Sequence, residues 1–327
     1  MYVESASLRV YVARRVLQTI PLLLGVIVIA FALSHLAPGD PVYIFAGEAA
    51  SEEYLNMLRE HLGLNRPLYE QLVIYVITVI QGDLGRSFVH GQPVLKVIWD
   101  RLPATLLLTG AATLFSFALG IVLGVISSKR PYSIADNIIT AICLSGYSIP
   151  VFWFAQTLII VLSVGLGWFP VQGMVTVREE MTGIGYVFDV AHHLFLPALT
   201  LTLVRLALTT RLTRASMLEV CGQDFITTAW SKGLDENTVF YRHVLRNALL
   251  PVTTVLGLEI GTMVAGAILT ETVFGWPGLG RLMYDAIVTR DYPLLMGNFV
   301  VLSVSVVILN LITDISYGVL DPRIRRR

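Results

Sequence analysis

Few side chains in this sequence have the types and spacing that catalysis requires, and the densest group is Asp189, His192 and His193. A histidine beside a carboxylate can serve as a general base, but hydrolytic chemistry also needs an activated nucleophile or a metal-bound water. The sequence contains no H-E-x-x-H pattern and no G-x-S-x-G pattern. An intramembrane enzyme is therefore the least favoured interpretation, and we predict no catalytic residue.

Patterns that would bind a nucleotide or a metal are also missing. None of the three lysines, Lys96, Lys129 and Lys232, follows a G-x-x-x-x-G pattern, so the sequence has no P-loop. The two cysteines, Cys143 and Cys221, are far apart, which excludes a disulfide framework and a Cys-rich metal site. The net charge is zero and no basic block precedes the last five residues. We therefore predict no cofactor, no metal and no nucleic-acid partner.

Two ionisable side chains stand inside otherwise apolar segments: Arg205 within 193–210 and Glu259 within 247–270. A charge at the middle of a bilayer costs about 2.5–3.5 kcal/mol on insertion scales. We expect Arg205 and Glu259 to pair or to share a polar network. The alternative is that Glu259 faces a transport pathway and meets a cationic substrate group. Ion-driven secondary transporters also carry mid-membrane charges, but this sequence shows no internal repeat and has few spans for that class.

The elements that must position these residues are membrane helices. Hydrophobic residues make up 55% of the sequence and charged residues 14%, against about 45–50% and 25% in soluble domains. Four stretches contain no Asp, Glu, Lys or Arg, and with the two segments above they give six candidate spans. The uncharged stretches are 16–38, 102–128, 137–177 and 292–313.

The stretch 137–177 is long enough for one kinked span or two short ones, and Pro150 near its middle indicates a kink. With one span there and the N-terminus inside, 14 basic residues fall on inner segments and 8 on outer segments. Two spans would place the basic segment 211–246 outside. The positive-inside rule therefore favours six spans with both termini cytoplasmic. The first span is longer than a signal-peptide core, and we expect it to be retained as an anchor.

The two largest outer connections have distinct characters. In 38–101, Ser51 can cap a helix that ends at Gly63, and Pro67 can open a second helix through Ile80 that is too short to span. The connection 271–293 is apolar and broken by glycine and proline, which indicates a re-entrant segment beside a pathway. The alternative is an interfacial turn in which Trp276 is an aromatic anchor. The residues of this candidate external gate are Phe274, Trp276, Pro277 and Gly278.

The inner segment 211–246 predicts two short helices joined by a glycine turn. Asp224 can cap a helix over 225–232 that Gly233 closes, and Asp235 can cap a second helix. The second helix carries an apolar face at i, i+4 and i+8, formed by Phe240, Val244 and Ala248. Two amphipathic pieces on the inner side of a bundle suit a protein partner. The alternative is a solvated linker that folds back onto lipid headgroups.

The segment 224–234, D-F-I-T-T-A-W-S-K-G-L, followed by 242–251, R-H-V-L-R-N-A-L-L-P, resembles the cytoplasmic coupling loop of ABC importer permeases. The resemblance is greatest to the first permease subunit of the dipeptide/oligopeptide/nickel branch and extends from about residue 9 to 325. Further matching motifs are R-R at 14–15, L-A-P-G-D-P at 36–41, G-D-L-G-R-S at 82–87, R-L-P-A-T at 101–105, G-W-F-P at 167–170, E-T-V-F-G-W-P-G-L-G at 271–280 and L-D-P-R at 320–323. The general loop pattern begins Glu-Ala-Ala, where this sequence has Thr227, Thr228 and Ala229.

The resemblance implies an all-α polytopic protein with six transmembrane helices and the type I ABC importer (MetI-like) permease fold. Residues 1–102 would form the first helix and external loop, and residues 103–327 a five-helix core with the coupling loop. The implied function is half of the translocation pathway of an ATP-driven importer of peptides, or alternatively of nickel or another small solute. The implied partners in the cell membrane are a second homologous permease subunit, two ABC ATPase subunits, an extracellular substrate-binding protein and membrane lipid.

The lack of a P-loop agrees with this implication, because the energy must then enter from another chain. The expected ATPase-coupling residues are Asp224, Phe225, Thr228, Ala229, Trp230, Gly233 and Leu234. Phe225, Ala229 and Trp230 would form one apolar face suited to a groove, with the small Ala229 allowing close approach. Gly233 would supply the positive φ that a tight turn between two helices needs.

Overall fold

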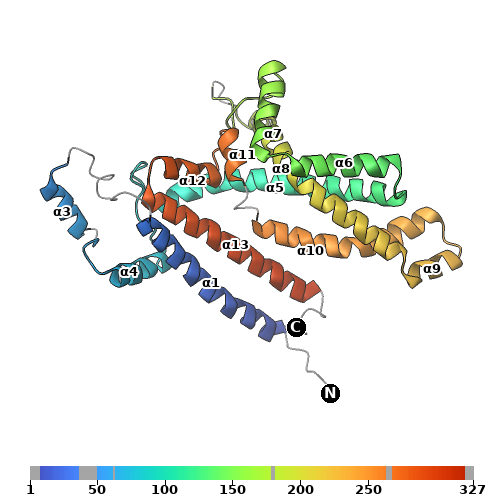
Figure 1. Cartoon of the computed structure of the whole chain (residues 1–327), viewed down its shortest axis with the longest axis horizontal. Coiled ribbons are helices and arrows are strands. Elements are labelled where there is room, and N and C mark those ends of the chain that lie inside the picture. The colour runs from blue at the N-terminus through green and yellow to red at the C-terminus, as the bar shows by residue number, and fades with distance from the viewer. Residues whose placement is uncertain (1–7, 37–49, 62, 178–180, 263–266, 321–327) are drawn as a thin grey trace. The chain divides into compact units, whose positions relative to one another are not determined.

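The computed structural model describes residues 8–36, 50–61, 63–177, 181–262 and 267–320, and its regular elements there are helices (Figure 1). One isolated antiparallel bridge joins Arg86 and Pro93. In chain order the elements are α1 (Leu8–Leu36), α3 (Glu52–His61), α4 (Leu68–Ile80), α5 (Val94–Lys129), α6 (Ile134–Ser148), α7 (Val151–Leu158), η1 (Ile159–Gly165), α8 (Ile184–Cys221), α9 (Asp224–Ser231), η2 (Thr238–Leu245), α10 (Arg246–Thr262), α11 (Ile268–Val273), α12 (Leu279–Val288) and α13 (Tyr292–Leu320).

Four of the described helices are long and apolar enough to cross a membrane, and they coincide with predicted spans one, two, four and six. These are Val10–Leu33, Val94–Lys129, Ile184–Cys221 and Tyr292–Ile315. In the third predicted span, α6 and the α7–η1 pair are bent by 103° at a break where Pro150 is the N-cap of α7, so this pair adds a fifth crossing if it spans once. The fifth predicted span contains α10, and its residues 263–266 lie outside the described part of the chain. The count of six spans thus stays a prediction.

Local sequence signals fix several helix ends. The Ser51 hydroxyl accepts a bond from the Tyr54 backbone N–H at 3.4 Å as α3 begins, and Gly63 has a φ of +70° beyond its end. Pro67 is the N-cap residue of α4. The helices expected from the outer connection 38–101 are therefore confirmed over α3 and α4.

The chain divides into two compact units, one made of residues 1–105 with 278–327 and the other of residues 106–277. In the first unit α13 packs along α1, where the Tyr11 hydroxyl donates to the Asp314 carbonyl at 3.1 Å and Arg15 pairs with Asp314 at 3.1 Å. The C-terminal helix thus belongs with the N-terminal one, a pairing that the expected division at residue 102 does not include.

The first unit also holds a buried carboxylate at the start of α13. Asp291 is fully buried and accepts hydrogen bonds from the Ser87 hydroxyl, from the Val89 backbone N–H at 3.1 Å and from the Leu294 backbone N–H at 3.3 Å. The carboxylate therefore caps α13 and ties the G-D-L-G-R-S turn to it.

In the second unit α5 and α8 approach each other closely along small residues. An added Cβ at Gly120 would lie 2.6 Å from the Thr209 Cβ, and one at Gly124 would lie 2.5 Å from the Thr213 Cβ. Buried Thr and Ser side chains continue the two rows, and the Thr202 hydroxyl donates to the Ala112 carbonyl at 3.3 Å. Small residues that permit close backbone approach are what helix pairs use in membranes, where lipid supplies no hydrophobic drive between helices.

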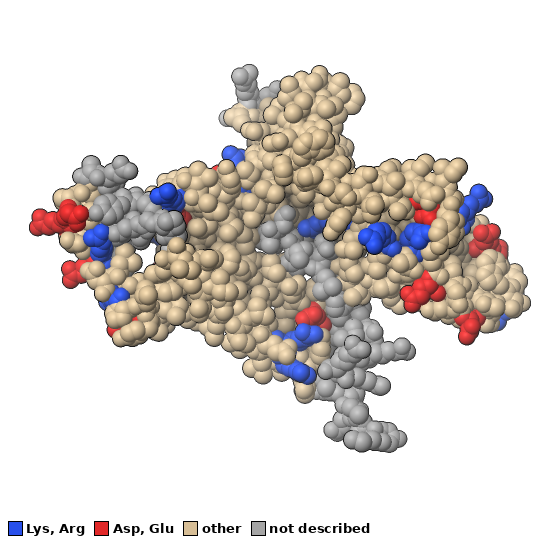
Figure 2. Space-filling model, in the orientation of Figure 1, with Lys and Arg blue, Asp and Glu red and all other residues tan. Residues whose placement is uncertain are grey.

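Charged side chains are sparse on the face of the molecule drawn in Figure 2. On this face, uncharged residues form broad areas, and Lys, Arg, Asp and Glu gather at only a few places. Such surfaces are expected of helices that meet lipid or partner chains instead of water.

Candidate functional site

The turn after α8 produces the short helix α9 and the segment that follows it. Gln223 is the N-cap residue of α9 and makes no capping bond, so Asp224 lies in the first turn and is not the cap that the sequence predicts. Its negative charge in the first turn is still stabilised by the positive, N-terminal end of the helix dipole. Gly233 has a φ of +76°, which confirms the predicted glycine turn. Asp235 caps the next segment as predicted, because its carboxylate accepts from the Thr238 backbone N–H at 3.0 Å. Bonds from the side chain and backbone of Thr238 hold the pKa of Asp235 below its ordinary value.

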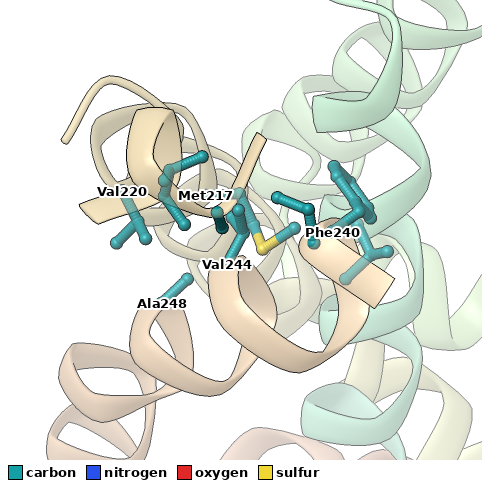
Figure 3. Packing of buried hydrophobic residues seen from close by; sticks show 9 residues of the cluster. Met217, Val220, Phe240, Val244 and Ala248 are labelled. Carbon is teal, nitrogen blue, oxygen red and sulfur yellow. The ribbon is translucent and has the colours of Figure 1, made fainter. Parts of the chain in front are cut away.

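The inner face of α9 is packed against the rest of the second unit. Ile226 and Ala229 are buried there in a hydrophobic cluster that Figure 3 shows from close by. The other buried members are Val125 of α5, Met217 and Val220 of α8, Val239, Phe240 and Val244 of η2, and Ala248 of α10. The predicted apolar face of Phe240, Val244 and Ala248 is therefore confirmed. Phe240 and Val244 lie on the π-helical segment η2 and Ala248 on α10, which follows it directly.

The outer face of α9 remains exposed. Phe225 is 41% exposed, Trp230 47% and Leu234 37%, and we call these three residues the outer α9 patch. Thr228 is exposed as well, with its hydroxyl donating to the Asp224 carbonyl at 3.0 Å. Ala229, by contrast, faces the intramolecular cluster. Of the expected docking face, only Phe225 and Trp230 are thus available to another protein.

A buried polar group lies close to this cluster, around Asp136 at the start of α6. Two nitrogens of Arg214 on α8 donate to its two carboxylate oxygens, Nε at 2.8 Å and Nη2 at 2.7 Å. The carboxylate also accepts from the Ser127 hydroxyl of α5 and from the Tyr132 backbone N–H at 2.8 Å. Tyr132 has a φ of +62°, which is uncommon for a residue with a side chain. We call Ser127, Tyr132, Asp136 and Arg214 the Asp136 node.

Arg205, one of the two predicted intramembrane charges, lies between α8 and α5. Its Nη1 donates to the Thr113 hydroxyl at 2.6 Å, so the guanidinium takes part in the polar row along the α5–α8 contact. The side chain of Glu259 lies outside the described residues. The pairing of Arg205 with Glu259 stays a prediction.

The glycine- and proline-broken segment after α11 is buried and internally bonded. Trp276 is fully buried and Phe274 nearly so, while Pro277 is partly exposed and Gly278 is buried. The Trp276 backbone N–H donates to the Glu271 carbonyl at 2.8 Å, and the Phe274 carbonyl accepts from the Gly173 N–H at 2.9 Å. Irregular backbone here is satisfied by protein, as a membrane-depth segment requires. A fully buried Trp276 does not serve as an exposed aromatic anchor in this structure.

The Asp189 and histidine group attaches a loop to the start of α8. Asp189 accepts from the Thr176 N–H and hydroxyl, each at 2.7 Å. The His193 Nδ1 lies 2.9 Å from the Asp189 carbonyl, and the His192 Nε2 lies 2.8 Å from the Trp168 carbonyl. Among the described residues, no three His, Cys, Asp or Glu side chains could share a metal ion.

Comparison with known sequences decides the family. The sequence model described as "Binding-protein-dependent transport system inner membrane component" matches residues 120–326. A second one, for the N-terminal part of such membrane components, matches residues 8–109. The chain belongs to this family of binding-protein-dependent transport permeases.

Curated relatives cover nearly the whole chain. The oligopeptide transport system permease protein AppB of Bacillus subtilis (strain 168) is 45% identical over 315 residues, which are 96% of this chain and 98% of AppB. The dipeptide transport system permease protein DppB of Escherichia coli (strain K12) is 41% identical over 336 residues, covering 97% of this chain and 99% of DppB. The di/tripeptide permease DppB of Pseudomonas aeruginosa (strain UCBPP-PA14) is also 41% identical, over 332 residues.

A solved structure shares the fold. An inward-facing form of the MetNI methionine ABC transporter contains a chain that matches with a TM-score of 0.55 at 18% identity. The match covers 69% of this permease and 96% of that chain. The all-α, MetI-like permease fold predicted from the sequence is therefore confirmed, and the chain is a multi-pass membrane protein of a transport system.

Sequence reasoning missed two features of the permease, the α5–α8 row of small residues and the Asp136 node. The row has a sequence signal, because Ser116, Gly120 and Gly124 recur at four-residue spacing in a span, as small residues at a helix contact do. The sequence signal for the Asp136 node is weaker. Asp136 and Arg214 stand at the ends of apolar segments, but nothing local in the sequence pairs them.

Proposed function

We propose that this permease forms half of the translocation pathway of an ATP-driven peptide importer. A second homologous permease subunit completes the pathway, and an extracellular binding protein delivers the substrate. Peptides are proposed as the substrate class because the relatives with 41–45% identity carry names of oligopeptide, dipeptide and di/tripeptide systems. The chain itself has no P-loop, so two separate ATPase subunits supply the energy.

The observation that carries the coupling part of this proposal is the two-faced helix α9. Its inner face is fixed by Ile226 and Ala229 in the cluster, and its outer patch presents Phe225 and Trp230 to the surroundings. A short helix with one anchored face and one aromatic face suits insertion into a groove. Large aromatic side chains also carry much of the binding energy at protein interfaces. The outer α9 patch is therefore the proposed docking surface of an ATPase subunit.

The proposed orientation follows from the charges. With both termini and α9 on the cytoplasmic side, 14 basic residues face inward and 8 outward. The segment with Phe274, Trp276, Pro277 and Gly278 then lies toward the outside, where we propose that it borders the pathway and acts as an external gate. In the same arrangement, Arg205 and Glu259 are proposed to form a polar network within the membrane.

The experiment that tests the docking proposal is co-purification of the ATPase subunits with variants of the outer α9 patch. We expect Phe225→Ala and Trp230→Ala to weaken retention of the ATPases by about tenfold or more, because truncating an interface hot spot costs about 2 kcal/mol or more and about 1.4 kcal/mol corresponds to tenfold in affinity. Tyr284→Ala is the matched control, since Tyr284 is 47% exposed on α12 and outside the proposed surface. Retention by both α9 variants at the level of Tyr284→Ala would refute the docking proposal.

A further inference from the structure

The Asp136 node joins four separate parts of the second unit at one carboxylate. Ser127 belongs to α5, Tyr132 to the turn between α5 and α6, Asp136 to α6 and Arg214 to α8. The Asp136 side chain is 3% exposed and that of Arg214 is 25% exposed. The two-point contact between guanidinium and carboxylate fixes orientation as well as distance, which a single charge contact does not do.

Apart from this node, α6 has little buried surface. Asp136 and Cys143 are its only buried residues in the described structure. Cys143 packs with Leu206 and Ala207 of α8, and Ile139 and Leu203 pack against them, so α6 is attached to α8 by apolar contacts along its length and by the ion pair at its start. The Ser133 hydroxyl caps α6 by accepting from the Asp136 backbone N–H at 3.3 Å, and the ion pair ties this capped start to α8 and orients it about those apolar contacts.

The node also lies next to the cluster that anchors α9. Val125 stands two residues before Ser127 on α5, and Met217 three residues after Arg214 on α8, and both are cluster members. Lys129, at the end of α5, has its Nζ 6.0 Å from the Phe240 ring centroid and 5.9 Å from that of Tyr241, a cation–π arrangement with η2. The end of α5 and the end of α8 thus hold both the cluster that anchors α9 and the start of α6.

The backbone turn between α5 and α6 depends on the same carboxylate. Tyr132 adopts its positive φ with its N–H bonded to Asp136, and its ring lies 5.8 Å from the Arg214 guanidinium carbon. A left-handed conformation is unfavourable for a residue with a side chain and persists when its surroundings hold it. A bond network that holds a strained turn between two helices restricts how those helices can move against each other.

We propose that Asp136 and Arg214 are positioning residues for energy coupling. The ion pair makes the start of α6 move with the end of α8 that carries α9, so that a displacement imposed on α9 reaches α6 and the bend at Pro150. This inference rests on the proposed function, in which an ATPase displaces α9. A purely structural ion pair would instead affect only folding and assembly.

The deciding variant is Asp136→Leu combined with Arg214→Met. Replacing a buried ion pair by apolar residues of similar volume is often neutral or stabilising for a fold. Asp136→Leu also removes the acceptor of the Ser127 hydroxyl and the Tyr132 N–H, so assembly is measured beside coupling, and Arg214→Lys tests the two-point contact with that acceptor kept. The full complex is reconstituted in vesicles with peptide-loaded binding protein, and assembly, ATP hydrolysis and peptide import are measured. We expect normal assembly and basal hydrolysis, with peptide imported per ATP reduced by about 2- to 30-fold, the range that mutations along coupling networks produce.

Two further variants complete the test. Arg214→Lys keeps the charge but loses the two-point contact, and it should also lower import per ATP. If the double variant fails to assemble, import per ATP by Arg214→Lys tests the positioning role instead. Arg281→Met with Asp285→Leu is the matched control, because that pair is exposed and 3.8 Å apart on α12, and it should leave import per ATP unchanged. Import per ATP within twofold of the unmodified complex in the assembled Asp136 and Arg214 variants would overturn the inference.

The same assay separates this inference from the proposed function. If Trp230→Ala lowers coupling while the assembled node variants do not, α9 docks as proposed and only the positioning role is wrong. If Trp230→Ala and the node variants all leave import per ATP unchanged, the docking of α9 itself is refuted, and the inference that rests on it fails too. Loss of import per ATP in both sets supports both statements.

Discussion

The close approach of α5 and α8 predicts a steric effect that one methyl group can reveal. In Gly120→Ala the new Cβ would lie 2.6 Å from the Thr209 Cβ and 2.7 Å from its Cγ2, where ordinary contact is 3.4–4 Å. The obstructing atoms belong to a β-branched side chain on a helix, which has little rotamer freedom. The two helices must therefore separate by about 1 Å, and overpacking of this kind costs about 1–3 kcal/mol.

Gly110→Ala is the control that separates the cost of overpacking from the change in helix propensity. Gly110 lies on the same helix, and an added Cβ there meets nothing within 4 Å. Both variants gain the same helix propensity, up to about 1 kcal/mol per Gly→Ala change. The difference between them is then the cost of overpacking, and we expect Gly120→Ala to be about 1–3 kcal/mol less stable than Gly110→Ala.

The measurement is the midpoint of unfolding as SDS is titrated into the purified permease in mild detergent. Thr209→Gly removes the obstructing atoms, leaving the Thr210 backbone nitrogen at 3.3 Å as the remaining tight contact. A double-mutant cycle of Gly120→Ala with Thr209→Gly should therefore show a favourable coupling of about 0.5–3 kcal/mol. Equal midpoints for Gly120→Ala and Gly110→Ala, together with zero coupling, would refute the close approach of the two helices.

Three further predictions concern other parts of the chain. Asp291→Ala should lower the free energy of unfolding by about 1–3 kcal/mol in the same titration, because it leaves buried donors unsatisfied. The control Asp285→Ala, on the exposed side of α12, should change it by less than about 0.5 kcal/mol. Similar losses in both variants would contradict the role of Asp291 as a buried hydrogen-bond acceptor. Cys221, an exposed thiol, should react with a membrane-impermeant maleimide only in inverted vesicles, and labelling in intact cells would reverse the proposed orientation. Gly233→Val should lower ATPase retention more than Gly233→Asn, since Asn tolerates positive φ and Val does not; equal retention would mean that the turn is not needed.

Periodicity and turn chemistry were enough to predict the local structure around α9. The apolar spacing of Phe240, Val244 and Ala248 and the glycine turn at Gly233 both appear in the structure. These signals are local, because each depends on residues within one or two turns of the chain. The helix caps were less predictable, as Asp235 caps its helix and Asp224 does not.

The orientation of α9 could not be read from its own sequence. Apolar side chains occur at Phe225, Ile226, Ala229 and Trp230 and thus occupy more than one face of an eight-residue helix. Which of them face inward depends on the shape of the surface formed by α8 and η2. That surface buries Ile226 and Ala229 and leaves the two larger aromatic residues outside, so the small residue serves internal packing and not the approach of a partner.

Hydrogen-bonded pairs between residues far apart in the sequence could not be predicted either, because they too depend on how the helices pack. Arg214 and Asp136 are 78 positions apart, and either could have bonded elsewhere as far as local pattern shows. Their bond requires that α6 and α8 already lie side by side, and this arrangement follows from apolar packing around Cys143. Likewise, the bond of Arg205 to Thr113 depends on the α5–α8 crossing, so the sequence predicts a polar network around Arg205 without indicating that Thr113 belongs to it.

The contacts of α8 change in character along its length, and this order has a mechanical consequence. Thr202, Thr209 and Thr213 meet α5 through small side chains, Arg214 then binds the start of α6, and Met217 enters the cluster under α9. Small residues in close contact have few alternative packings, because their side chains have few rotamers to exchange. A displacement of the Met217 end would therefore be passed along α8 to α5 as a movement of whole helices, with little of it absorbed by repacking. In the proposed coupling, the glycine and threonine row and the Asp136 node would serve the same requirement: a displacement of the short helix α9 at one end must move the helices to which it is attached.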